Sequence, residues 1–255
     1  MTRVFTFKGK VVWVTGSVTG IGKEIAMEFA KYGADVVVHN YDNREKAEKI
    51  VTELKEQGTN ALLVEGNVTN KQDVETIVEQ IKEHYGRLDI LINNVGGSPF
   101  KFSFEDLEEE NWDAMINLNL KSTYFVTRAA LDLIKEQKGT IINTCSAVVR
   151  SGGIIGGSAY TTAKGGVEAL TRALAKELAS SDIRVNGVSP GLVDTPFHAV
   201  NVGEKYPQLI DQIPLKRVGT PKDLVGAFLF LASDYANYIT GEIIEVSGGA
   251  KLSSN

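Results

Sequence analysis

The feature that most constrains the fold is a change of hydrophobic period within residues 11–22, which read VVWVTGSVTGIG. Residues 11–14 are successive apolar side chains, too few for a helix, and they predict a buried strand. Apolar residues then recur every four positions, at Ile21, Ile25 and Phe29, which is the spacing of one helix face. The sequence therefore predicts a strand, a glycine-rich turn and a helix in direct succession.

The predicted turn has the composition of a phosphate-binding loop. Glycines let the backbone approach a diphosphate, and the free N–H groups and positive dipole end of the helix attract its charge. The glycines are Gly16, Gly20 and Gly22, which gives T-G-x-x-x-G-x-G rather than the dinucleotide fingerprint G-x-G-x-x-G. An ordinary tight turn before a helix is the alternative, so the loop alone does not identify a nucleotide site.

Short apolar runs and amphipathic helical patterns alternate along the whole chain. The predicted strands are residues 11–14, 36–38, 61–64, 88–92, 140–144, 183–188 and 242–246, and the longest predicted helix covers about residues 111–137. Continuous apolar strands between helices are typical of a parallel sheet covered on both faces. We therefore expect an α/β fold, a doubly wound parallel sheet of seven strands in one domain, with ligands beyond the carboxyl ends of the strands.

Composition excludes several classes of protein. The chain is 43% hydrophobic and 23% charged, which is ordinary for a soluble domain, and its net charge of −5 without a basic block makes nucleic acid and anionic membranes poor partners. Cys145 is the only cysteine, so no intrachain disulfide forms, which fits a reducing compartment. We find no secretory signal and no apolar run of membrane-spanning length, so we expect a cytoplasmic protein.

Chemistry-bearing residues follow the fourth and fifth predicted strands. The fourth is followed by N-N-V-G at residues 93–96, for which a plain Asn-Gly turn is the alternative. The fifth is followed by Ser146, and Tyr160 and Lys164 then lie one helical turn apart on one face. An adjacent cation favours the phenolate and lowers a tyrosine pKa by roughly 1–3 units. A Tyr-x-x-x-Lys pair is common by chance, so its position after the strand carries the argument.

Together these motifs resemble the short-chain dehydrogenase/reductase family, from about Lys8 to Gly249. Val95 departs from the family's N-N-A-G and adds two methyl groups near the adenosine half of the nucleotide. The pattern is most similar to the glucose 1-dehydrogenase and 3-oxoacyl-[acyl-carrier-protein] reductase kinds. The resemblance implies a single Rossmann-type NAD(P)-binding domain over residues 1–255 and hydride transfer between NAD(P) and a secondary alcohol or ketone, of sugar, polyol or 3-oxoacyl type.

Four catalytic roles follow from the resemblance. Tyr160 would be the general acid/base, Ser146 would hydrogen-bond the reacting oxygen, and Lys164 would bind the ribose and tune Tyr160. The fourth residue is Asn119, which is preferred to Asn117 because the family pattern is an Asn before Leu, seven residues after the Trp. Asn119 would hold a water that passes protons toward Lys164. A helix asparagine on a polar face is the alternative.

The resemblance also implies a nucleotide site. Its residues would be Gly16, Ser17, Thr19, Gly20, Ile21, Gly22, Asn40, Tyr41, Arg44, Asn67, Val68, Asn94, Val95, Gly96, Tyr160, Lys164, Pro190, Gly191, Val193 and Thr195. We favour NADP over NAD, because Asn40 closes the second strand where an acid would repel a 2′-phosphate, and Arg44 follows it. Arg44 could equally be a solvated helix residue. Asn67 would accept a hydrogen bond from the adenine amine through its amide oxygen.

The other polar features have ordinary explanations. His39, His84 and His198 lack ligand spacing, so no metal site is expected. The acidic run at residues 105–110 suits a helix N-terminus, and a gripping role for Arg150 competes with a plain surface charge.

Residues 196–214 hold three of the six prolines and predict a substrate loop or lid, in which Phe197 and Tyr206 could face substrate or core. A homotetramer through the long helices is expected from the family. The acidic run argues mildly against docking of an acidic carrier protein. A nucleotide-binding regulatory or scaffold protein without chemistry is the alternative function, although all the catalytic residues are present.

Overall fold

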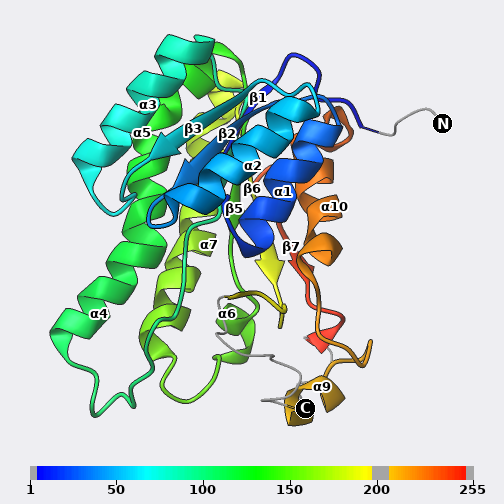
Figure 1. Ribbon diagram of the computed structural model, residues 1–255. Coiled ribbons are helices and arrows are strands. Elements are labelled where there is room, and N and C mark those ends of the chain that lie inside the picture. Colours follow the sequence, from blue (N-terminus) through cyan, green and yellow to red (C-terminus); the bar gives the residue numbers. More distant parts are fainter. Residues whose placement is uncertain (1–4, 197–206, 251–255) are drawn as a thin grey trace.

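The computed structural model describes residues 5–196 and 207–250, and it contains a parallel sheet of seven strands (Figure 1). The strand order is β3-β2-β1-β4-β5-β6-β7, so the order reverses between β1 and β4. This reversal is the switch point at which doubly wound sheets bind ligands. The strands are β1 (Val11–Val14), β2 (Asp35–Asn40), β3 (Ala61–Glu65), β4 (Ile90–Asn93), β5 (Thr140–Thr144), β6 (Arg184–Pro190) and β7 (Ile243–Val246).

Helices cover both faces of the sheet, as the continuous apolar strands predict. One face, with Val12 and Val14 of β1, is covered by three helices. They are α1 (Gly20–Lys31), α2 (Arg44–Glu56) and α10 (Pro221–Ala232). The opposite face holds Val11 and the fully buried Trp13, which pack with α3 (Lys71–Tyr85), α5 (Ser122–Glu136) and α7 (Ser158–Leu178). Alternate residues of one strand thus feed two cores, which is why such strands are apolar throughout. The predicted fold class is confirmed.

The long helix predicted over residues 111–137 is present but not uniform. It consists of α4 (Glu109–Ile116), a π-helical segment η1 (Asn117–Lys121) and α5, which follow one another without a break. Single-turn π segments within helices often mark functional sites. Here the segment contains Asn119, whose side chain is fully buried.

The remaining helical elements are short. They are α6 (Val148–Ser151), η2 (Ala179–Ser181), α9 (Pro207–Asp211) and η4 (Asp234–Ala236). The expected loop at residues 196–214 is described only at Pro196 and residues 207–214, so Phe197, His198 and Tyr206 lie outside the described residues. No described helix combines the length and the low polarity that crossing a membrane requires.

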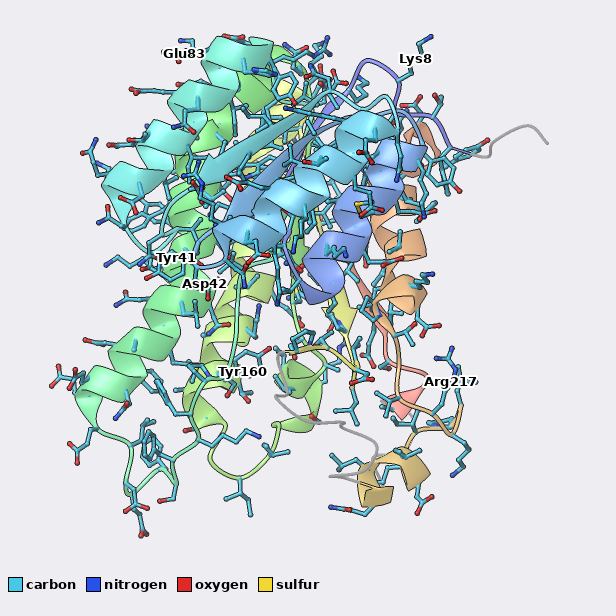
Figure 2. All side chains as sticks on the ribbon, viewed as in Figure 1. Lys8, Tyr41, Asp42, Glu83, Tyr160 and Arg217 are labelled. Carbon is cyan, nitrogen blue, oxygen red and sulfur yellow. The ribbon has the colours of Figure 1, made fainter. Side chains whose placement is uncertain are left out.

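Parallel strands place all their carboxyl ends at one edge of the sheet. Tyr41 and Asp42, which follow β2, and Tyr160 lie toward that edge, whereas Lys8 and Glu83 lie at the opposite end (Figure 2). The loops after β1, β2, β4, β5 and β6 therefore converge on the region where the sequence places its candidate site.

Candidate active site

The glycine-rich turn after β1 has the conformation of an anion-binding loop. Gly16 and Gly20 adopt left-handed φ values of 64° and 55°, which favour glycine. A Cβ at Gly22 would stand 2.2 Å from the carbonyl oxygen of Gly16, so only glycine allows this packing of loop on helix. Thr19 caps α1, and within the described part of the chain its side chain makes no capping hydrogen bond. The N–H groups of the first helical turn therefore remain available for an anion.

The loop is fastened to the end of β2 by backbone and side-chain hydrogen bonds. The Ser17 N–H donates to the carbonyl oxygen of His39 (3.1 Å), and the Ser17 hydroxyl accepts from the His39 N–H (2.8 Å). The His39 ring accepts from the Gly16 N–H at Nδ1 (2.9 Å), and its Nε2 is 3.0 Å from the carbonyl oxygen of Gly66. The ring is therefore neutral with its proton on Nε2, and burial lowers its pKa to about 4.

The segment after β4 supports the same loop from the other side. The Thr15 hydroxyl accepts hydrogen bonds from the N–H groups of Asn94 (2.9 Å) and Val95 (3.1 Å). The Asn94 amide donates to the carbonyl oxygens of Thr15 (3.0 Å) and Gly16 (3.3 Å). Val95 lies against Gly16, with its Cγ2 3.0 Å from the point where a Cβ of Gly16 would stand. The two methyl groups by which Val95 departs from the family pattern thus pack on the loop.

The segment after β6 closes over the glycine loop. A Cβ at Gly20 would lie 3.5 Å from Cβ of Thr195, and Gly191 packs on the backbone of Ser247. Val193 is buried and forms a β-bridge with Gly219. Of the residues expected after β6, Thr195 stands against the glycine loop, whereas the contacts of Gly191 and Val193 are with Ser247 and Gly219. This shape suits a group that is held between the two segments.

Ser146, Tyr160 and Lys164 meet at the carboxyl end of β5. Ser146 is two residues past the strand, and its side chain hydrogen-bonds Tyr160, which is in the first turn of α7. Lys164 lies one turn further on, only 3% exposed, and its Nζ donates to the carbonyl oxygen of Thr144 (2.9 Å). Nζ is 6.0 Å from the centroid of the Tyr160 ring. The predicted triad is thus assembled in space.

The pKa shifts in the triad differ from the sequence expectation. Burial raises the pKa of Tyr160, and the hydrogen bond with Ser146 offsets part of this rise. The expected lowering by Lys164 is not seen, because Nζ is directed at Thr144 rather than at the phenol oxygen. Burial lowers the pKa of Lys164 itself to about 8. Lys164 therefore still carries its proton at pH 7 but releases it more readily than an exposed lysine does.

Asn119 uses its side chain to hold the loop after β4. Its Oδ1 accepts from the Gly97 N–H (2.8 Å), and its Nδ2 donates to the carbonyl oxygens of Gly97 (2.8 Å) and Met115 (3.0 Å). A Cβ at Gly96 would stand 2.8 Å from both Asn119 Oδ1 and Lys164 Nζ, so the loop, η1 and α7 converge there. The amide thus acts on the backbone of the site, and these contacts do not show the water-holding role that the resemblance implies.

Two of the residues expected around the adenosine of the nucleotide are already engaged with neighbouring side chains of the protein. The Asn67 amide oxygen, expected to accept from adenine, already accepts from the N–H (2.9 Å) and hydroxyl (2.8 Å) of Thr69. Arg44, expected to be either free for a phosphate or solvated, is ion-paired with Glu48 (2.8 Å) and Glu65 (3.0 Å). Tyr41 is exposed and Val68 is buried.

Sequence reasoning missed three residues that shape this site: Thr15, His39 and Glu65. Thr15 and His39 hold the glycine loop, and Glu65 contacts both Asn40 and Arg44. Each lies at or next to the carboxyl end of its strand, which is the signal that could have identified them. Cys145 is buried, which raises the pKa of its thiol to about 12. The described residues contain no group of three His, Cys, Asp or Glu arranged to hold a metal.

Comparison with known proteins identifies the class to which this fold and site belong. The family model described as enoyl-(acyl carrier protein) reductase matches residues 16–251. The chain is 36% identical to the 3-oxoacyl-[acyl-carrier-protein] reductase of Staphylococcus aureus, over 94% of this chain and 97% of that protein. It is 39% identical to the enzyme of that name from Haemophilus influenzae, over 96% of this chain and all (100%) of that protein.

A solved structure has the same architecture. It is a putative short-chain alcohol dehydrogenase from Sinorhizobium meliloti, with a TM-score of 0.89 and 32% identity, covering 98% of this chain and 99% of that one. The chain therefore belongs to the short-chain dehydrogenase/reductase family. Membership makes the protein an oxidoreductase that acts on CH–OH or C=O groups, and NADP or NAD is consistent with this family. The alternative of a regulatory or scaffold protein without chemistry is therefore set aside.

Proposed function

We propose that this enzyme transfers a hydride reversibly between a nicotinamide nucleotide and a carbon that bears a hydroxyl or carbonyl, with Tyr160 as general acid/base. The observation that carries the proposal is the convergence of Ser146, Tyr160 and Lys164 at the end of β5, beside the loop that Asn119 holds. A hydroxyl from the end of a strand, next to a phenol and a buried cation from one helix, suits proton transfer to an oxygen.

In the reducing direction Tyr160 donates its proton to the carbonyl oxygen of the substrate, and in the oxidising direction it accepts the hydroxyl proton. Its raised pKa favours the protonated form, which is the form that reduction requires. The Ser146 hydroxyl donates to the same oxygen and stabilises the charge that develops there. When bound, the nicotinamide supplies or accepts the hydride.

Lys164 and Asn119 act behind these two residues. Lys164, whose pKa is about 8, is a source for the proton that Tyr160 gives up. Asn119 fixes the backbone at Gly97 and keeps Gly96 against Lys164. The nucleotide would be held by the first-turn N–H groups of α1, the segment after β4 and the segment after β6.

The names of the relatives favour a 3-oxoacyl compound as substrate, so a 3-oxoacyl carbonyl is our first choice ahead of a sugar or polyol. Acidic side chains gather on two surfaces, at Glu108, Glu109, Glu110 and Asp113 and along α2. An acidic carrier protein would be repelled there. We therefore expect the enzyme to accept a free 3-oxoacyl thioester or ester without a carrier.

Three further expectations remain predictions. Residues 196–214 would contact substrate, a homotetramer would form through α4, α5 and α7, and the enzyme would be cytoplasmic. The first can be tested by shortening this loop, which includes α9 at Pro207–Asp211, and measuring the KM for substrate. Light scattering tests the second.

The test of the function is Tyr160→Phe, assayed at 340 nm with NADPH and NADH against 3-oxoacyl esters, ketones, sugars and polyols. Loss of the phenolic proton should lower kcat by about 10²- to 10⁴-fold while nucleotide affinity stays within about 2-fold. Tyr124→Phe is the matched control, because Tyr124 is an exposed tyrosine of α5. Full turnover by Tyr160→Phe, or a wild-type protein without turnover on every substrate, would contradict the proposal.

A further inference from the structure

The end of β2 is where dinucleotide-binding folds read the adenosine ribose, and here that position is Asn40. The Asn40 side chain is 3% exposed, and both its polar atoms are occupied. Nδ2 donates to Oε1 of Glu65 (2.9 Å), and Oδ1 accepts from the Asn43 N–H (3.0 Å). The amide is therefore held in one orientation. It places a carboxylate from the neighbouring strand beside the ribose position.

Glu65 is the last residue of β3 and is paired in register with Asn40. Its second oxygen, Oε2, accepts from the guanidinium of Arg44 (3.0 Å). Arg44 also donates from Nε to Glu48 (2.8 Å), so two carboxylates flank one cation. The local charge is −1 rather than the +1 that Arg44 alone would give. A 2′-phosphate would have to compete with both acids for this arginine.

A carboxylate beside the ribose discriminates between nucleotides through charge. It accepts a hydrogen bond from a free 2′-hydroxyl and repels a 2′-phosphate. The sequence favours NADP because no acid closes β2, but the fold brings an acid to that place from β3. Glu65 is partly exposed, at 34%, whereas Arg44 is 70% exposed. The acid is thus the more firmly placed of the two charges.

We propose that Glu65 sets the choice between NADH and NADPH, by occupying Arg44 and by adding its own negative charge beside the ribose. This rests on the proposed function, since it assumes that a nicotinamide nucleotide binds along the glycine loop. Removing the charge should release Arg44 for a 2′-phosphate and remove an acceptor for a 2′-hydroxyl. Glu65 is then a specificity-determining residue that contacts no reacting atom.

The experiment measures the Kd of NADPH and of NADH by calorimetry, without substrate. Glu65→Gln should bind NADPH about 10-fold more tightly and NADH about 2- to 3-fold more weakly than wild type, since one charge contact near the surface is of that size. Glu65→Asp keeps the charge and should keep the wild-type preference. Thermal unfolding of each variant checks that it is folded.

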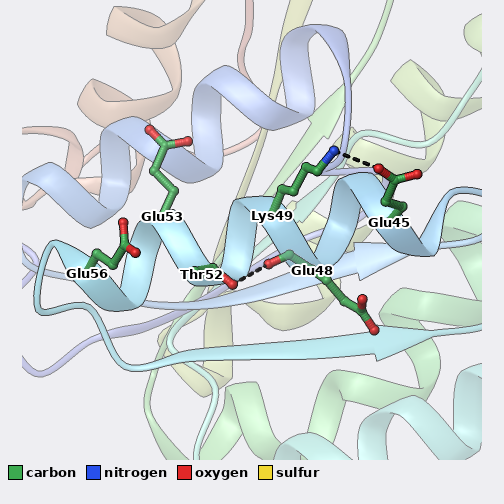
Figure 3. Close-up of a pocket in the computed structure, with 6 residues that line it drawn as sticks. All are labelled: Glu45, Glu48, Lys49, Thr52, Glu53 and Glu56. Carbon is green, nitrogen blue, oxygen red and sulfur yellow. Dashed lines mark hydrogen bonds and ion pairs between the residues drawn. The ribbon is translucent and has the colours of Figure 1, made fainter.

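Two further variants separate specific from general charge effects. Glu45→Gln removes the same charge from the outer face of α2, where Glu45 pairs with Lys49 at 2.7 Å (Figure 3). It should leave the ratio of the two Kd values within about 2-fold of wild type. In Arg44→Gln/Glu65→Gln, the gain in NADPH affinity should be smaller than in Glu65→Gln, because the cation that receives the phosphate is absent and only the loss of the Glu65 repulsion remains.

Several outcomes overturn the inference. Equal shifts of both nucleotides in Glu65→Gln would indicate a structural role only, and an equal effect of Glu45→Gln would indicate general charge. A full gain without Arg44 would remove the proposed partner. If the wild type binds both nucleotides and Glu65→Gln leaves the ratio unchanged, only this inference fails. If the wild type binds neither nucleotide, the proposed function fails and this inference fails with it.

Discussion

The proposed site has a catalytic end, with Asn119 and Lys164, and an adenosine end, with Asn40, Arg44 and Glu65. The polar groups at these two ends are held in different ways. At the catalytic end Asn119 and Lys164 are buried, and their hydrogen bonds go mainly to backbone carbonyls. At the adenosine end Arg44 is 70% exposed and is held by side-chain carboxylates. Buried groups with backbone partners are held in one position by the fold, whereas exposed ion pairs contribute about 0–1 kcal/mol each. The proposed reaction therefore rests on groups that the fold holds in place, whereas the proposed choice of nucleotide rests on charges that can be changed with little loss of stability.

Among substitutions that test this difference between the two ends, the largest effect on turnover is expected at Lys164. Lys164→Met should lower turnover by at least about 10²-fold, because the cation behind Tyr160 is lost. The same variant should be more stable at pH 7 by about 1 kcal/mol. The pKa of Lys164 falls from 10.5 to about 8 on folding, so burial of the charge destabilises the folded state fully below pH 8. Loss of the hydrogen bond to Thr144 offsets part of the gain.

Kinetics and urea unfolding measure the two effects together. Lys176→Met, on the same helix but exposed, is the control and should change neither by much. A Lys164→Met protein that is inactive and also strongly destabilised would mean that the lysine is a structural support. The loss of turnover would then reflect a damaged fold and not the missing cation.

A second prediction concerns the histidine that holds the glycine loop between the two ends. The pKa of His39 is lowered from 6.5 to about 4 in the folded state, so unfolding takes up a proton between these values. Stability is therefore complete above about pH 6.5 and is lost as the pH falls toward 4, by about 3 kcal/mol from this residue. Nucleotide affinity should fall only as the pH approaches 4, where His39 of the folded protein takes up its proton and Nδ1 can no longer accept from Gly16.

Urea unfolding between pH 4 and 7.5, compared for wild type and His39→Gln, isolates this contribution. The difference between the two proteins should narrow as the pH falls. His84, which is exposed, provides the control through His84→Gln. Parallel pH profiles for wild type and His39→Gln would contradict the assignment of a neutral, buried ring.

Sequence reasoning found the fold because buried parallel strands leave a strong pattern. The apolar runs, the period change at the glycine loop and the positions of Ser146, Tyr160 and Lys164 are all local signals, and each is confirmed in place. Strand ends were displaced by up to two residues, as at β4, which begins at Ile90 rather than at residue 88. The catalytic roles of these residues stay predictions.

The features that sequence reasoning missed depend on contacts between distant segments. Glu65 stands beside Asn40 because β3 pairs with β2 in one register, and a shift of one residue would turn its side chain to the other face. The raised pKa of Tyr160 depends on how much of the phenol is buried, which the spacing to Lys164 cannot reveal. The π segment around Asn119 likewise reflects packing of η1 against α7.

The smallest predicted effect is at Glu48, the outer partner of Arg44. Its side chain is 56% exposed, and among residues 5–196 and 207–250 its carboxylate hydrogen-bonds only Nε of Arg44, without the second contact to Asn40 that Glu65 makes. Glu48→Gln should therefore change stability by less than about 0.5 kcal/mol and tighten NADPH binding only about 2-fold. Because the charge is solvated, the gain measured by calorimetry should vanish between about 20 mM and about 500 mM salt. A gain in NADPH affinity as large as that of Glu65→Gln, or one that persists at high salt, would contradict the view that the charges at the adenosine end are exposed and screened by salt.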